Sequence, residues 1–166
     1  ELDEHTYVQT DFTDFDGENQ ITFEMFFKPF HAPGIYISSN LFYRSDWGSL
    51  NYTSDQNNQD HFIFSLEGIG SVPYSTAAAT DIEQDAWYHI AAEYDGSYIR
   101  IYLDGNLVAQ NSVGGYLNSN SYPLTVAQYF EGLIDIVRIS DTATFGGENF
   151  DPYNQNYSNN AGVYLL

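Results

Sequence analysis

The sequence contains no cysteine, and its lysine and arginine residues together number only 4. Without cysteine, the chain has neither a disulfide framework nor a thiolate metal site. No apolar run approaches the roughly 20 residues that a membrane-spanning helix needs, and apolar residues at helical spacing are almost absent. These absences exclude a disulfide-stapled domain, a zinc–thiolate domain and a helical bundle, and we expect no membrane insertion.

Acidic residues dominate the charge of the chain. Aspartate and glutamate number 23 against 4 basic residues, which gives a formal net charge of −19 and a pI near 4.1. The basic residues are scattered, at Lys28, Arg44, Arg100 and Arg138. A polyanion would be repelled, so we exclude nucleic acid as a partner and expect no binding to anionic membranes. Cations must screen the excess charge, and we expect bound calcium, a saline habitat such as that of a marine bacterium, or both.

The hydrophobic content is high enough for a folded core despite this charge. Of the 166 residues, 43% are hydrophobic and 17% are aromatic, which excludes a disordered acidic tail. No linker, repeat or shift in composition divides the chain, so we expect a single domain over residues 1–166. The chain opens without a signal peptide, and we expect it to be excised from a larger secreted or cell-surface protein. Sequons at Asn51 and Asn156 favour an extracellular location, although they matter only in a eukaryotic host.

Alternation of apolar and polar residues, the pattern of a half-buried β-strand, recurs along the whole chain. The clearest runs are residues 21–29 and 98–103, and the second is followed by Asp104-Gly105, the strongest short-range signal for a hairpin turn. Two polar stretches, residues 45–60 and 145–160, are expected to be loops. Further strands are expected over residues 6–10, 35–44, 61–67, 71–74, 87–94, 106–110, 124–128 and 133–139. So many short strands in one domain indicate an all-β fold of two packed antiparallel sheets, a sandwich or jelly roll.

Three motifs follow one another along the chain. The longest runs from Trp87 to Ala109 and contains a Trp-x-His strand, an Asp-Gly turn and a strand ending in Tyr-x-Asp-Gly. Residues 21–29 precede it, and Phe130 to Ile139 follow it with the pattern Phe-x-Gly-x-Ile-Asp-x-Val-Arg. Together they resemble the laminin-G-like domains of the concanavalin A-like jelly rolls, which implies a two-sheet antiparallel β-sandwich. The resemblance leaves function open, because lectins, carbohydrate-binding modules, adhesin modules and some glucanases and lyases share this fold.

The resemblance also implies a structural calcium ion between the first and last strands, as many relatives hold. By this resemblance Asp135 supplies one ligand, the carbonyl of Gly132 supplies another, and Asp3 or Glu4 supplies a third. Calcium takes roughly six to eight oxygen ligands, which a chain rich in Asp and Asn can provide from its loops. The alternative is that Asp135 is a polar residue on the solvent face of its strand.

A sugar-binding site needs an exposed aromatic platform, on which the C–H face of a pyranose ring stacks. Trp47 is the best candidate, because a large aromatic has little reason to lie in a polar stretch unless it caps the sheet edge or contacts a ligand. Trp87, in contrast, opens a predicted core strand, and we expect it to be buried. The other residues expected at the ligand site are Arg44, Asp46, Tyr43 and Tyr52.

The catalytic motif of the related glucanases is incomplete in this sequence. Retaining glucanases on this fold carry Glu-x-Asp-x-x-Glu, because their two carboxyl groups must lie about 5 to 5.5 Å apart across the scissile bond. The only partial match is Glu1-Leu-Asp3, and Thr6 stands in its last position. We therefore assign no catalytic residue.

Glu24 and His89 are interpreted as internal packing residues, with the charge of Glu24 compensated by Arg138 or Arg100. The leading hypothesis is a non-catalytic, lectin-like carbohydrate-binding module that is stabilised by calcium, binds a neutral glycan and is monomeric within a larger chain. The alternatives are a protein-binding adhesion or spacer module and an enzyme of the glucanase or lyase type.

The excess of negative charge predicts that stability depends on salt. Like charges on a compact body repel one another and dissolved ions screen them, so we expect the midpoint of thermal unfolding to rise from low to high NaCl. Circular dichroism at constant calcium concentration measures this midpoint. A midpoint that does not change with NaCl would contradict the expected salt adaptation.

Overall fold

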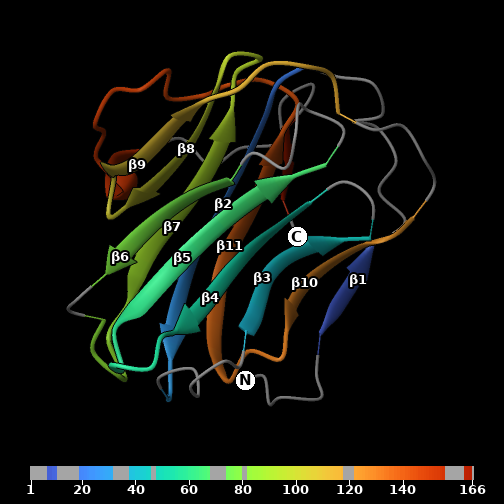
Figure 1. Ribbon diagram of the computed structural model, residues 1–166. Helices are drawn as coiled ribbons and strands as arrows, with labels where there is room; N and C mark the ends of the chain where they lie inside the picture. Colours follow the sequence, from blue (N-terminus) through green and yellow to red (C-terminus); the bar gives the residue numbers. More distant parts are fainter. Residues whose placement is uncertain are drawn as a thin grey trace.

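The computed structural model describes residues 7–10, 19–31, 38–45, 48–67, 74–79, 82–117, 122–155 and 163–165. Its strands form two six-stranded sheets that pack face to face (Figure 1). All strand pairs in them are antiparallel, which confirms the expected two-sheet sandwich. No helix among the described residues is long and apolar enough to cross a membrane.

Each sheet combines strands from both halves of the chain. The front sheet in Figure 1 has the order β1 (Val8–Thr10), β10 (Leu124–Gln128), β3 (Ser38–Arg44), β4 (Gly48–Ser54), β5 (Asp60–Leu66) and β6 (Tyr74–Ala79). The back sheet has the order β12 (Val163–Leu165), β11 (Gly132–Ser140), β2 (Ile21–Pro29), β7 (Tyr88–Tyr94), β8 (Tyr98–Leu103) and β9 (Asn106–Ser112). A 3-10 helix, η1 (Pro152–Asn154), lies between β11 and β12. The sequence did not predict β4 or β12, and β6 extends well beyond the strand expected over residues 71–74.

The hairpin signal at Asp104-Gly105 is confirmed. These residues join β8 to β9, and their φ angles are 48° and 74°. Two successive positive φ values are what a type I′ turn requires, and this turn matches the right-handed twist of the strands that it joins. The turn therefore fixes the pairing at the edge of the back sheet.

The core lies between the two sheets and is largely aromatic. On β2, the residues that face the front sheet are Ile21, Phe23, Met25 and Phe27. The ring of Phe23 stacks on Phe42 of β3 with centroids 4.7 Å apart, and Phe27 meets Phe62 of β5 edge-on at 5.9 Å. This face of β2 is the one that the alternation in the sequence predicts, and its burial holds the sheets together.

Part of the outer face of the back sheet is buried as well, because the segment after β11 packs against it. We call this segment, residues 141–155, the C-terminal cover. Its Phe145 and Phe150 stack with ring centroids 3.8 Å apart, and both rings lie against Tyr102 of β8. With Ala91 of β7 they form a second apolar cluster. Two rings of the stretch over residues 145–160, which was expected to be a loop, are therefore packed against the sheet, those of Phe145 and Phe150.

A buried carboxylate anchors the C-terminal cover to the back sheet. Glu93 of β7 is 0% exposed, and its oxygens accept hydrogen bonds from the backbone N–H groups of Phe145 at 2.5 Å and Gly146 at 3.1 Å. Arg100 donates to the same carboxylate at 2.9 Å. Tyr102 donates to it at 3.3 Å, and burial together with this charge raises the pKa of Tyr102, which keeps the phenol protonated.

A second buried carboxylate lies on the same face of the sheet. Glu24 of β2 pairs with Arg138 of β11, and its Oε2 lies 3.0 Å from Nε2 of His89 on β7. The sequence predicted a partner for Glu24 among Arg138 and Arg100, and the structure selects Arg138. Arg100 binds Glu93 instead, so each of these two buried glutamates has its own arginine. The interpretation of Glu24 and His89 as internal residues is confirmed.

The stretch of residues 45–60 is only in part a loop, because it contains all of β4. Alternate residues of β4 face the core, namely Leu50, Tyr52 and Ser54. The hydroxyls of Ser54 and Tyr52 donate to the buried carboxylate of Asp60 at 2.6 and 2.9 Å. Polar side chains that satisfy one another take inward positions here, so the composition of the stretch concealed a strand.

Because Glu93 anchors the C-terminal cover to the back sheet, we expect Glu93→Gln to destabilise the fold. The amide loses the charge that binds two backbone N–H groups and leaves Arg100 without its buried partner, so we expect the free energy of unfolding in urea to fall by about 3 kcal/mol. Glu131→Gln is the matched control, because its exposed pair with His31 spans 3.6 Å and contributes little. Equal stabilities for the two variants would contradict the anchor.

A carboxylate beside the anchor predicts sensitivity to acid. Burial acts to raise the pKa of Asp95, but hydrogen bonds from the N–H groups of Ser97 and Tyr98 and from Arg100 outweigh it and lower the pKa. Ionised Asp95 therefore stabilises the folded state at a pH above its unfolded-state pKa of about 3.9. This stabilisation is lost as the pH falls through the lower folded-state pKa.

We expect the stability difference between the native chain and Asp95→Asn to shrink when urea unfolding is measured at about pH 3 rather than about pH 6. A difference that is independent of pH would show that this carboxylate does not contribute.

Candidate functional site

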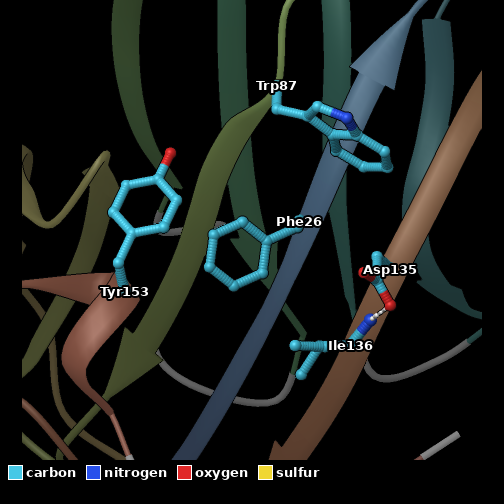
Figure 2. A pocket seen from close by; sticks show the side chains of 5 residues that line it. All are labelled: Phe26, Trp87, Asp135, Ile136 and Tyr153. Atoms are coloured by element: carbon cyan, nitrogen blue, oxygen red, sulfur yellow. Dashed lines mark hydrogen bonds between the residues drawn. The ribbon is translucent and has the colours of Figure 1, made fainter.

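A cavity opens on the outer face of the back sheet, next to the C-terminal cover. Its volume is about 310 Å³. Figure 2 shows the five residues that line it, which are Phe26, Trp87, Asp135, Ile136 and Tyr153. They come from β2, from the residue before β7, from β11 and from η1, so the cavity exists only in the assembled fold.

Phe26 and Trp87 form the part of the cavity that the sheet provides. Phe26 projects outward from β2, where its backbone pairs with Asp135 of β11 on one side and His89 of β7 on the other. It is 8% exposed and forms the floor, whereas Trp87 is 42% exposed. The expectation that Trp87 is buried was wrong. Tyr88 packs against the core, so the alternation of the strand turns Trp87 to the outer face.

A bulge in β11 forms the opposite wall. The register against β2 shifts between Asp135 and Arg138. Ile136 lies in the bulge with a φ of 46°, a conformation that is unusual for a β-branched residue. As a result Asp135 and Ile136, although adjacent in sequence, both line the cavity, and Val137 occupies the core position.

The carboxylate of Asp135 is oriented by the backbone N–H of the next residue. Its Oδ1 accepts a hydrogen bond from the N–H of Ile136 at 2.9 Å, the dashed line in Figure 2. Oδ2 has no hydrogen-bond partner within the described part of the chain. This second oxygen is therefore available to accept a hydrogen bond from a ligand.

Tyr153 completes the cavity from the C-terminal cover. Its ring lies against Phe26 with centroids 5.4 Å apart and an interplanar angle of 46°, and its side chain is 69% exposed. Asp151 caps η1 by accepting the N–H of Tyr153 at 3.0 Å. Burial and the charges of Asp104 and Asp151 raise the pKa of Tyr153, so its hydroxyl stays neutral.

Gly105 fixes the position of η1 relative to the sheet. The N–H of Phe150 donates to the carbonyl of Gly105 at 2.9 Å. A side chain at Gly105 would lie only 1.9 Å from the carbonyl oxygen of Phe150, and the backbone has a positive φ there. Only glycine allows this close approach, so the hairpin turn at the end of β8 also positions Tyr153.

The ligand site expected around Trp47 is not assembled by the residues that the structure describes. Tyr52 is 1% exposed and belongs to the core, and Arg44 is 2% exposed. Each lies on a strand at a position that faces inward, and its role as a ligand-binding residue stays a prediction. Tyr43 is 37% exposed, and its position as a binding residue stays a prediction. Asp46 and Trp47 lie outside the described residues.

The described residues contain only part of the expected calcium site. Asp135 is exposed, but its neighbours in the cavity are aromatic and aliphatic rather than oxygen ligands. Within the described ranges there is no group of three or more His, Cys, Asp or Glu residues that could hold a metal. Gly132 is buried where β11 pairs with Pro29, and Asp3 and Glu4 lie outside the described residues. A calcium site that includes the N-terminal carboxylates stays a prediction.

Sequence reasoning missed most of the cavity. One usable signal was the alternation of side chains over residues 87–94, which places Trp87 on the same face of the strand as the polar His89 and Glu93. Ile136 and Tyr153 gave no such signal, because the bulge and the packing of the C-terminal cover depend on residues far away in the sequence. The arrangement offers aromatic surfaces for stacking and one carboxylate oxygen as an acceptor.

Comparison with known proteins agrees with the fold. The family model described as "Concanavalin A-like lectin/glucanases superfamily" matches residues 2–148. No curated protein sequence matches the chain. The CBM40 of the Ruminococcus gnavus IT-sialidase superposes with a TM-score of 0.66 at 12% identity, over 87% of this chain and 90% of that one.

Two further structures are similar. One is domain 4 of AbnA, a GH43 extracellular arabinanase from Geobacillus stearothermophilus that was solved with arabinotriose. It superposes with a TM-score of 0.61 at 16% identity, over 86% of this chain and 69% of that one. The other is the enzymatically active domain of bacteriophage CBA120 tailspike protein 2, with a TM-score of 0.63 at 15% identity over 82% of this chain. The match covers only 24% of the tailspike chain. Such identities show the fold alone. Because the family model covers most of the sequence, the chain belongs to the concanavalin A-like lectin/glucanase superfamily.

Proposed function

We propose that the protein is a non-catalytic carbohydrate-binding module and that the cavity over Phe26 holds the sugar. The observation that carries the proposal is the lining of this cavity. Two exposed aromatic residues, Trp87 and Tyr153, stand beside the buried ring of Phe26, with the carboxylate of Asp135 in the same cavity.

This combination suits a pyranose ring. The C–H groups of one sugar face are apolar and pack against aromatic rings, while the hydroxyls at the edge need hydrogen-bond partners. Oδ2 of Asp135 accepts such a bond, and a bond to an ionised carboxylate is stronger than one between neutral groups. Asp135 is held in place by the N–H of Ile136, so little order has to be gained on binding.

A neutral sugar fits better than an acidic one. The cavity residues include one carboxylate and no lysine or arginine. The chain carries a net charge of −19, and a sugar acid or sulfate would meet this field without a basic partner in the cavity. We infer that the ligand is a neutral glycan.

Binding without catalysis is favoured by the number of carboxylates. Glycoside hydrolysis canonically needs two carboxyl groups that flank the scissile bond, and Asp135 is the only carboxylate among the residues that line the cavity. The AbnA domain, which was solved with arabinotriose, and the CBM40 of the sialidase share the fold. These similarities support the proposal of a binding module in a secreted or surface-displayed protein, which would contact polysaccharides outside the cell.

Trp87→Ala tests the proposal. Ligand stabilises the folded state, so thermal unfolding against a panel of laminarin, agarose oligomers, xylan fragments and arabinotriose identifies a binding glycan. We expect Trp87→Ala to weaken binding of that glycan, measured by calorimetry, by about 30-fold, or about 2 kcal/mol. Tyr116→Ala is the control, because Tyr116 is 69% exposed but does not line the cavity.

Trp47→Ala decides between the cavity and the site expected from the sequence. If Trp47→Ala abolishes binding while Trp87→Ala retains it, the cavity is not the sugar site. If no glycan in the panel raises the unfolding midpoint, the adhesion or spacer function gains support. Turnover of any polysaccharide would contradict the non-catalytic assignment.

A further inference from the structure

We propose that the cavity selects a neutral sugar that carries a methyl group in place of a hydroxymethyl group, a 6-deoxyhexose. This inference rests on the proposed function and names the class of sugar. It follows from the distribution of polar groups around the cavity.

The polar and apolar parts of the cavity are separated. Asp135 and Ile136 lie on one side of Phe26, and Tyr153 lies on the other (Figure 2). Of the two β11 residues that line the cavity, only Asp135 has a polar side chain, and its carboxylate accepts hydrogen bonds. Beside it, Ile136 and the ring of Phe26 form an apolar corner.

The bulge in β11 creates this corner. In a regular strand Ile136 would point to the core, because neighbouring side chains alternate between the faces. The extra residue instead leaves Ile136 next to Asp135, at a φ of 46° that disfavours a β-branched side chain. Asparagine or glycine would adopt this conformation with less strain, so the position carries an apolar side chain against its backbone preference.

When a ring hydroxyl of a sugar binds Asp135, the substituent on the neighbouring ring carbon lies against an apolar surface. A ring hydroxyl donates to Oδ2 of Asp135, and a neighbouring ring substituent then meets Ile136 and Phe26. A hydroxymethyl group there would place its hydroxyl against the side chains of Ile136 and Phe26, which have no hydrogen-bonding group, whereas a methyl group packs favourably against them. An acetamido group also offers a methyl group, but its carbonyl needs a donor that this corner does not provide.

The test compares sugars that differ only in the hydroxyl on C6. Methyl glycosides of L-fucose and L-galactose form one pair, those of L-rhamnose and L-mannose form a second, and N-acetylglucosamine is the acetamido probe. Calorimetry with the full 166-residue chain measures each affinity. We expect one 6-deoxy sugar to bind about 10- to 100-fold more tightly than its hydroxylated counterpart, the range within which an apolar pocket rejects an added hydroxyl.

Ile136→Thr assigns the selectivity to the corner. Threonine keeps the β-branch and its backbone strain but adds a hydroxyl, so the preference for the 6-deoxy sugar should fall by about 10-fold. Ile63→Thr, at a half-buried position on β5 of the front sheet, is the matched control and should leave the preference unchanged.

The outcomes separate this inference from the proposed function. Binding of a neutral glycan with no preference for the 6-deoxy member, or tighter binding of N-acetylglucosamine, overturns the inference and leaves the carbohydrate-binding function standing. An unchanged preference in Ile136→Thr also overturns it. If neither these sugars nor the glycan panel binds, the proposed function itself fails.

Discussion

The bond between Glu93 and the C-terminal cover is the interaction on which the candidate site depends. The carboxylate is fully buried and receives the backbone N–H groups of Phe145 and Gly146, which brings the cover onto the back sheet. The aromatic stack of the cover then closes over Tyr102, and η1 presents Tyr153 to the ring of Phe26. Without the cover, the outer face of the sheet would expose Phe26 and two acids rather than enclose a cavity.

The same arrangement explains how so acidic a chain folds and what it presents to a ligand. Its three arginines are all buried, and two of them, Arg138 and Arg100, each pair with a buried glutamate. The few positive charges are therefore used inside the protein, where an unpaired carboxylate would be costly. Most acidic side chains in the described part of the chain stay at least partly exposed, and a neutral ligand is the kind that such a surface admits without opposing its field.

The sequence was most informative where structure depends on neighbouring residues. Alternation over residues 21–29 predicted the core face of β2, and Asp104-Gly105 predicted the hairpin between β8 and β9. It failed where distant segments decide the outcome. The bulge at Ile136 depends on the pairing of β11 with β2, and the burial of the cover depends on Glu93, so neither has a local pattern. The burial of Tyr52 also had no local signal, because its hydroxyl is satisfied inside the protein by Asp60.

A sugar held in the cavity contacts Trp87, and because the chain has only 2 tryptophans this contact can be measured directly. The indole N–H resonances of Trp87 and Trp47 can be followed by NMR while a glycan that stabilises the protein is added, with each resonance assigned by its Trp→Phe variant. The account predicts that the Trp87 resonance shifts and saturates with the same midpoint as binding measured by calorimetry. A Trp87 resonance that stays in place while the glycan binds would contradict it.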